Sequence, residues 1–347
     1  MKHLRSVWPL LVGGAVGLAL ASTWVSAQSE WAKRPAVQQL YEKAKAEKEV
    51  ALFVPNARES DWMAKAFSER FPGIAVKASA DPQYSTRLIT EARAGRYSAD
   101  VLSHSLGGLI EMQKRDLLGN MDWSSFDVRG SNVVLGGLAA TTHNFVYTII
   151  YARDKVDAMD LPRKWTDLIE PKWKGRMVTQ AFLLPRLMGF LALEWGPQET
   201  EKWGRALIEQ QGTLVVNSNS ERYLRTGERV LAVAENVATS YQHKRNGINV
   251  DFLVMDLVPA TQFIVAITKN APHPNAARLL AGWYASDEGK ALSEKLNNES
   301  DLRPGSRGTL FKRVNDNQSK ILLEDASTMA KRAEYYKQFS GFIRGTE

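Results

Sequence analysis

The stretch VALFVPNARESDWMAKAFSERFPGIAVKASA, residues 50–80, decides the fold class of this chain. Its first five residues are all apolar and predict a buried strand, and residues 62–67 then carry the apolar face of a helix. Residues 74–76 are the next apolar run, and the same alternation of helix and strand continues to residue 114. This order predicts an α/β fold in which crossover helices connect the strands of a parallel sheet.

Small polar residues follow the predicted strands of this first unit. Ligands of open parallel sheets lie beyond the carboxyl ends of the strands, so these positions are candidate ligand contacts. They are Asn56, Arg58, Ser79, Ser103 and His104. Arg58 could bind a carboxylate or phosphate through its forked guanidinium, or it could be an ordinary surface arginine. His104 has a structural alternative too, as a hydrogen-bonded residue after a buried strand.

A second α/β unit begins after the β-rich run at residues 146–151. Its predicted strands lie at residues 177–179, 213–216 and 230–234, and a closing helix is predicted over residues 322–342. Polar residues that follow these strands are further candidate ligand contacts: Thr179, Gln180, Asn217, Ser218, Asn236 and Tyr241. The neighbouring Asn219 and Ser220 have an alternative role as helix N-caps.

The composition is that of an ordinary globular protein. The chain has 347 residues, of which 44% are hydrophobic and 24% charged, and this length favours two lobes over a single core. The formal net charge of +7 favours an anionic partner. Lysine and arginine are dispersed along the chain, whereas nucleic-acid-binding proteins concentrate them on one face, so we expect no nucleic-acid binding.

The first 27 residues have the pattern of a secretory signal peptide. Lys2 and Arg5 precede an uncharged stretch, and residues 25–27 (VSA) form a small-x-small cleavage site. The alternative is an uncleaved anchor, because residues 6–29 carry no charge and could span a membrane. The chain has no cysteine, which excludes a lipid anchor on cysteine and fits the oxidising periplasm. We therefore predict a soluble periplasmic protein.

The chain lacks the motifs of common enzymes. It contains no GxSxG, no HExxH and no GxxxxGK[ST], and its five histidines are scattered rather than paired at metal-ligand spacing. We expect no enzymatic activity, no catalytic residue and no cofactor.

Four segments together resemble the extracellular solute-binding proteins of ABC importers, in the branch that includes ferric-ion-binding proteins and small-anion relatives. These segments are residues 66–74, 99–101, 165–176 and 269–289. The resemblance implies a type II periplasmic-binding-protein fold, in which two crossover strands form a hinge between two lobes. It also implies that residues 28–143 and 257–347 form lobe 1, and that residues 144–256 form lobe 2.

The resemblance also settles how we read EPKWKGR, residues 170–176. A tryptophan between two lysines could indicate nucleic-acid binding, but the resemblance implies a turn that leads into the first strand of lobe 2. Trp173 should then pack inside while the lysines face water.

The function implied by the resemblance is that of a periplasmic substrate-binding component of an ABC importer. It would capture a small organic or inorganic anion between its lobes, as a monomer, and present this solute to an inner-membrane permease. One alternative is a sensory module with the same fold. The other is a ferric-ion carrier, with Tyr241, Glu235 and His104 as metal ligands. The ferric relatives carry adjacent tyrosines in this neighbourhood, whereas Tyr241 is the single tyrosine among residues 236–243 of this chain.

Overall fold

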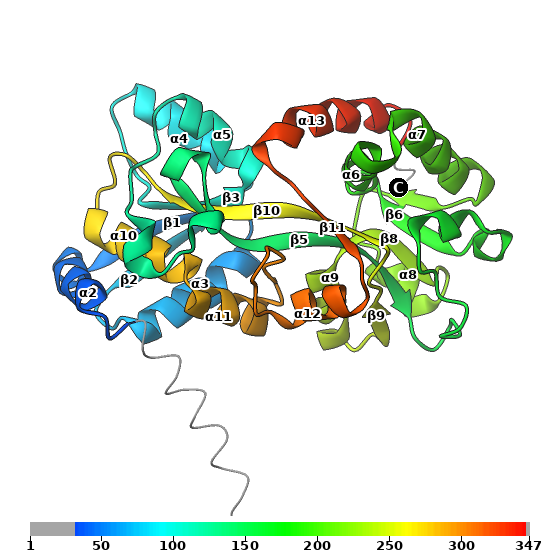
Figure 1. The fold of residues 1–347 in the computed structure, drawn as a ribbon, viewed down its shortest axis with the longest axis horizontal. Helices are drawn as coiled ribbons and strands as arrows, with labels where there is room; N and C mark the ends of the chain where they lie inside the picture. The colour runs from blue at the N-terminus through cyan, green and yellow to red at the C-terminus, as the bar shows by residue number, and fades with distance from the viewer. Residues whose placement is uncertain (1–31, 345–347) are drawn as a thin grey trace, which may run out of the picture.

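The computed structural model describes residues 32–344, which form two α/β lobes joined by a pair of long strands (Figure 1). The predicted signal peptide, residues 1–27, lies outside the described residues. The main path of the sheet runs β2-β1-β3-β10-β5-β8-β6-β7, so its first strands belong to one lobe and its last strands to the other. No helix within residues 32–344 is both long and apolar enough to cross a bilayer.

The first lobe contains the parallel strands that residues 50–80 predicted. Its strands are β1 (Glu49–Val54), β2 (Ala75–Ala80), β3 (Val101–Ser105) and the short β4 (Val133–Val134). Its helices are α2 (Pro35–Glu47), α3 (Ala57–Arg70), α4 (Tyr84–Arg93), α5 (Leu106–Lys114), α10 (Pro274–Ala285), α11 (Asp287–Asn297) and α12 (Thr309–Asp316). β1 pairs in parallel with both β2 and β3, which confirms the predicted parallel sheet.

Side-chain alternation along β1 explains why helices cover both faces of this sheet. Leu52 and Val54 belong to a buried cluster with α2, α3 and α10, whereas Phe53 belongs to another with α4 and α5. Successive residues of a strand point to opposite faces, so an apolar run of this length needs cover on both sides.

The second lobe repeats this architecture. Its strands are β6 (Met177–Gln180), β7 (Leu214–Val216), β8 (Leu231–Asn236) and β9 (Val250–Phe252), and its helices are α6 (Leu184–Trp195), α7 (Pro197–Arg205), α8 (Glu221–Thr226) and α9 (Val237–Arg245). β6 pairs in parallel with β7 and β8. The segment EPKWKGR forms the predicted turn before β6: Trp173 is fully buried, while Lys172 and Lys174 are exposed.

Two strands cross between the lobes. Residues 139–146 of β5 (Ala139–Ala152) pair with β10 (Leu257–Ile267), and its residues 147–151 pair with β8 of the second lobe. On β5, Phe145 and Tyr147 face one side of the sheet, while Val146 packs on the other side with α9 and α12. The two faces of the crossover strands therefore have different environments.

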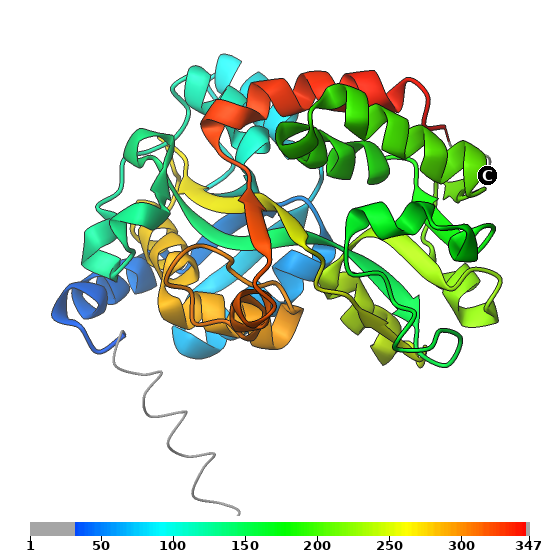
Figure 2. The same cartoon turned by 45° about the vertical axis from the view of Figure 1, so that its right-hand side comes forward.

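The C-terminal segment differs from its sequence-based assignment. Residues 320–323 form β11 (Lys320–Leu323), which pairs with β10, and only then does α13 (Ala326–Ser340) begin. The prediction placed residues 257–347 in lobe 1, but Tyr335 and Phe339 of α13 are buried in the core cluster of lobe 2. Figures 1 and 2 show α13 beside α6. Residue periodicity could not reveal this docking, because α13 meets α6 only after the chain has crossed the hinge.

Candidate functional site

A cavity of about 830 Å³ lies between the two lobes, on the face of the crossover strands that carries Phe145 and Tyr147. We call it the interlobe cleft. Its lining residues are Pro55, Asn56, Pro82, His104, Ser105, Phe145, Tyr147, Phe182, Arg186, Thr261, Phe263, Glu324, Met329, Arg332, Ala333 and Tyr336. The carboxyl ends of β1 and β3, both crossover strands, the start of α6 and one side of α13 all contribute to this lining. The cleft therefore lies where an open parallel sheet binds its ligands.

The first lobe presents Asn56 and His104 to the cleft, as the sequence predicted for ligand contacts. The Asn56 side chain also caps α3, because its Oδ1 accepts a hydrogen bond from the Glu59 amide at 3.1 Å. The Nδ1 atom of His104 accepts a hydrogen bond from the Ser105 amide at 2.8 Å, which places the proton of the neutral ring on Nε2. Burial lowers the pKa of His104, and the positive charge of Arg186 lowers it further. His104 is thus a neutral hydrogen-bonding group at neutral pH.

The second lobe presents an arginine without a counter-ion. Arg186 lies in the first turn of α6, and its guanidinium carbon stands 5.5 Å from the ring centroid of Phe182 and 5.9 Å from that of Tyr336. Within residues 32–344, no carboxylate lies within 4.0 Å of its guanidinium nitrogens. Burial raises the pKa of Tyr147, and the charge of Arg186 opposes that rise. The Arg186 charge therefore acts on groups across the cleft.

A second arginine in the cleft is already neutralised. Arg332 of α13 donates a hydrogen bond to Glu324, and both side chains are almost fully buried. The Arg332 guanidinium carbon also lies 3.3 Å from the ring centroid of Phe190. Burial raises the pKa of Glu324, and the charge of Arg332 opposes that rise. This pair shapes the wall of the cleft. The charge of Arg186 also opposes the rise in the pKa of Glu324, but Arg186 forms no ion pair within 4.0 Å among residues 32–344.

Arg58, the predicted anion clamp, has a partner inside the protein. It forms an ion pair with Glu299, a buried residue that also accepts a hydrogen bond from Asn236 Nδ2 at 3.2 Å. Asn236 caps α9 through its Oδ1, which the Ala238 amide approaches to 3.3 Å. Both predicted contacts are thus engaged with Glu299 and lie outside the cleft lining. The sequence could not reveal this pair, because Glu299 lies 241 residues from Arg58.

Three more predicted contacts are held in local hydrogen bonds. The buried hydroxyl of Ser103 donates to Glu59, and that of Thr179 donates to the Val233 carbonyl at 2.9 Å. Gln180 donates to Glu235 at 2.9 Å. Ser79 on β2 is half-buried, whereas Asn217 and Ser218 are exposed, and none of these three lines the cleft.

The three predicted ferric ligands lie in different environments. Tyr241 lines a separate cavity with residues of α11 and α12, while His104 lines the interlobe cleft. Glu235 is buried and accepts hydrogen bonds from Gln180 and from Ser220 at 2.5 Å. Within residues 32–344, no group of three or more histidine, cysteine, aspartate or glutamate side chains is arranged to hold a metal ion.

Two buried acids lie outside the cleft lining: Glu59 inside lobe 1, and Glu299, which contacts Asn236 of lobe 2. Burial raises the pKa of both Glu59 and Glu299 to about 7, and Arg58 opposes this rise in each case. Burial also lowers the pKa of His143 to about 3. The Tyr284 hydroxyl lies 3.3 Å from Glu59 Oε1 and 3.0 Å from His143 Nδ1, so these groups form one polar cluster.

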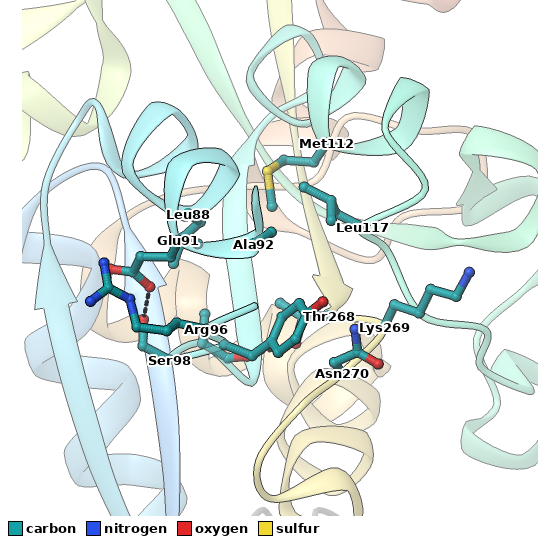
Figure 3. A pocket seen from close by; sticks show the side chains of 12 residues that line it. Leu88, Glu91, Ala92, Arg96, Ser98, Met112, Leu117, Thr268, Lys269 and Asn270 are labelled. Atoms are coloured by element: carbon teal, nitrogen blue, oxygen red, sulfur yellow. Dashed lines mark hydrogen bonds between the residues drawn. The ribbon is translucent and has the colours of Figure 1, made fainter. Parts of the chain in front are cut away.

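A small hollow in lobe 1 is too small to bind a solute. It has a volume of about 20 Å³ and lies between α4, α5 and the segment around Thr268 (Figure 3). A water molecule needs roughly 10–15 Å³ measured in this way, so the hollow holds about one water.

Sequence reasoning missed Arg186, although two local signals pointed to it. Pro185 occupies the first turn of α6, a favoured proline position, and it marks a helix that begins near Leu184. A cation in that turn is disfavoured by the helix dipole, so its presence calls for a reason other than helix stability. Of the two rings beside Arg186, Phe182 is a near neighbour in the sequence, whereas Tyr336 comes from the distant α13 and left no local signal.

Comparison with known proteins places the chain among transport proteins. The sequence model of the family described as bacterial extracellular solute-binding protein matches residues 55–291. No curated protein matches the chain.

Several solved structures have a similar fold. Iron-bound HitA from Pseudomonas aeruginosa is 20% identical, with a TM-score of 0.65, and the match covers 83% of this chain and 99% of that one. An ABC transporter substrate-binding protein from Bradyrhizobium japonicum is 14% identical, with a TM-score of 0.70 and coverage of 85% and 99%. Trichodesmium IdiA (FutA), solved with iron and citrate, is 16% identical, with a TM-score of 0.65 and coverage of 85% and 100%. The predicted two-lobed fold is confirmed, and at these identities the likeness concerns the fold alone.

Proposed function

The chain belongs to the family of bacterial extracellular solute-binding proteins, the substrate-binding components of ABC transporters, and we propose that its interlobe cleft captures a small anion. We further propose that the signal peptide, residues 1–27, exports the protein to the periplasm. There it would act as a monomer and present the anion to an inner-membrane permease. No chemical step on the solute is part of this proposal.

The observation that carries the proposal is that Arg186 lines the cleft without an ion pair to any carboxylate of residues 32–344. Arg186 is exposed and lines the cleft, so an anion that enters the cleft can reach its guanidinium. Its planar fork can hold a carboxylate or phosphate through two parallel hydrogen bonds. Asn56 and Ser105, on the opposite lobe, can supply further hydrogen bonds to the same solute.

Contacts from both lobes couple binding to closure of the cleft. Arg186 belongs to lobe 2 and Asn56 to lobe 1, so a solute that bonds to both favours the closed arrangement of the lobes. The solute binds the folded protein and should therefore raise its thermal stability by mass action. The ferric alternative has no comparable observation in its favour, because Tyr241, Glu235 and His104 lie in separate environments.

The proposal can be tested by identifying the solute that copurifies with the protein. Mass spectrometry of the material released from freshly purified wild type should detect an organic or inorganic anion. The variant Arg186→Ala should lose it, with Kd raised by about 30-fold or more, equivalent to about 2 kcal/mol. Arg278→Ala, which removes an exposed arginine of α10 outside the cleft, is the matched control and should retain the solute. A released metal ion, or equal retention by both variants, would contradict the proposal.

A further inference from the structure

We infer that the solute is an organic carboxylate with a planar, largely hydrocarbon body, rather than an inorganic oxyanion. This inference rests on the proposed capture of an anion in the same cleft. It follows from what surrounds Arg186 and from the size of the space in front of it.

The first argument is the chemical character of the cleft floor. The crossover strands contribute Phe145, Tyr147 and Phe263 to the lining. The rings of Phe145 and Tyr147 pack with centroids 4.8 Å apart, and Phe263 stacks on His143 at 4.6 Å, so neighbouring rings hold these side chains in place. A solute that lies on this floor loses contact with water and gains contact with aromatic rings. This exchange stabilises an apolar body, but it leaves an inorganic oxyanion without hydrogen-bond donors.

The polar groups of the floor are already engaged with each other. The hydroxyl groups of Tyr147 and Thr261 share a hydrogen bond, which helps to hold down the pKa of the tyrosine. A desolvated inorganic oxyanion needs hydrogen-bond donors around all of its oxygens. The donors of the cleft are instead divided between the lobes, with Arg186 on one lobe and Asn56 and Ser105 on the other. This arrangement suits a molecule with a charged head and an apolar middle.

The position of Arg186 supports a carboxylate head. Phe182 and Tyr336 both stand within 6 Å of its guanidinium carbon, so aromatic rings rather than polar groups frame the cation. A carboxylate bound through both of its oxygens leaves its substituent pointing away from the fork, toward the space between the rings. An aryl group placed there can stack against the same rings.

The cleft is large compared with a small oxyanion. Its volume of about 830 Å³ is several times the roughly 150 Å³ in which a buried cavity holds benzene. A sulfate-sized ion would leave most of this space to water against aromatic walls. A ring-bearing carboxylate would cover those walls and bury apolar surface, which adds to its affinity.

Calorimetric titration of the full-length protein with benzoate, cinnamate, acetate and sulfate at equal ionic strength tests the inference. We expect both aryl carboxylates to bind about tenfold or more tightly than acetate and sulfate. Phe145→Leu and Phe263→Leu should each weaken the binding of aryl carboxylates several-fold and leave acetate binding unchanged. Tyr241→Phe is the matched control, because Tyr241 lines a different cavity, and it should leave all four affinities unchanged.

The outcomes separate this inference from the proposed function. If sulfate binds more tightly than the aryl carboxylates, or if the phenylalanine variants bind them like wild type while Arg186→Ala abolishes anion binding, the cleft is an anion site and the inference is wrong. If none of the four anions binds and Arg186→Ala retains the copurifying solute, the proposed function itself fails.

Discussion

Replacing Glu59 with glutamine should flatten the pH dependence of stability. The Glu59 side chain is only 1% exposed, and its Oε1 accepts hydrogen bonds from Ser103 and, at 3.3 Å, from Tyr284. Its Oε2 is buried without a hydrogen-bond partner in the described part of the chain. Ionisation therefore places a poorly solvated charge inside the protein, which is why its pKa rises from 4.5 to about 7.

The sign of the effect follows from this raised pKa. Between pH 4.5 and pH 7 the folded state holds a proton at Glu59 that the unfolded state has released, so stability falls as pH rises through this window. A shift from 4.5 to about 7 corresponds to about 3 kcal/mol in total, and on the order of 2–3 kcal/mol is lost between pH 5 and pH 8. Glu299, whose pKa is also raised to about 7, adds a loss of the same sign.

Urea unfolding of wild type and of Glu59→Gln at pH 5 and pH 8 measures this difference. Wild type should lose on the order of 2–3 kcal/mol more stability than the variant between the two pH values. The variant keeps the contribution of Glu299, which should itself shrink because the charge of Glu59 helps to raise the pKa of Glu299. Glu334→Gln, at an exposed position on α13, should behave like wild type. Equal pH dependence in wild type and Glu59→Gln would refute the reasoning.

Three further substitutions test the packing and the buried charges. Trp173→Ala should lower the free energy of unfolding by about 3–5 kcal/mol, because it empties a fully buried site in lobe 2, and a loss below about 1 kcal/mol in urea unfolding would contradict this. Lys290→Met should lower the free energy of unfolding by about 3–5 kcal/mol, because Lys290 Nζ lies 2.7 Å from Asp301 Oδ2 and the variant leaves that buried carboxylate unpaired. Adding Asp301→Leu should recover most of this loss, and no recovery in the double variant would argue against the ion pair. Arg58→Ala should destabilise the protein more at pH 8 than at pH 5, because Glu299 loses its ion pair. Calorimetry should find the affinity of the variant for the solute within about twofold of wild type, and a larger loss of affinity would indicate that Arg58 contacts the solute.

Local patterns in the sequence were enough to predict the architecture. Apolar runs and helical stripes marked β1, α3 and β2, and these elements form where the pattern of residues 50–80 placed them. The turn before β6 was also predicted, with Trp173 inside. These features depend on neighbours a few residues apart, because backbone hydrogen bonding and side-chain periodicity act over one helical turn or one strand.

Element boundaries near the hinge were less predictable. The first residues of the helix predicted over residues 322–342 belong to β11 instead. Pairing with β10 satisfies the hydrogen-bonding requirement of their backbone groups. Asp325 then caps α13, because its Oδ1 accepts a hydrogen bond from the Thr328 amide at 2.8 Å. The strand partner was not visible in the sequence, since β10 lies about 60 residues earlier in the chain.

The assignment of charges to the site was decided by the tertiary structure alone. The sequence determined that Asn56 and His104 follow buried strands, and the fold brings both to the interlobe cleft. It could not determine which arginine is free, because Arg58 meets Glu299 from 241 residues away and Arg186 meets no carboxylate within residues 32–344. An ion pair forms wherever folding brings two charges within a few ångströms, whatever their separation along the chain. The sequence therefore determined the α/β fold and the edge of the sheet where the cleft lies, and long-range packing decided which arginine lines that cleft without an ion pair among residues 32–344.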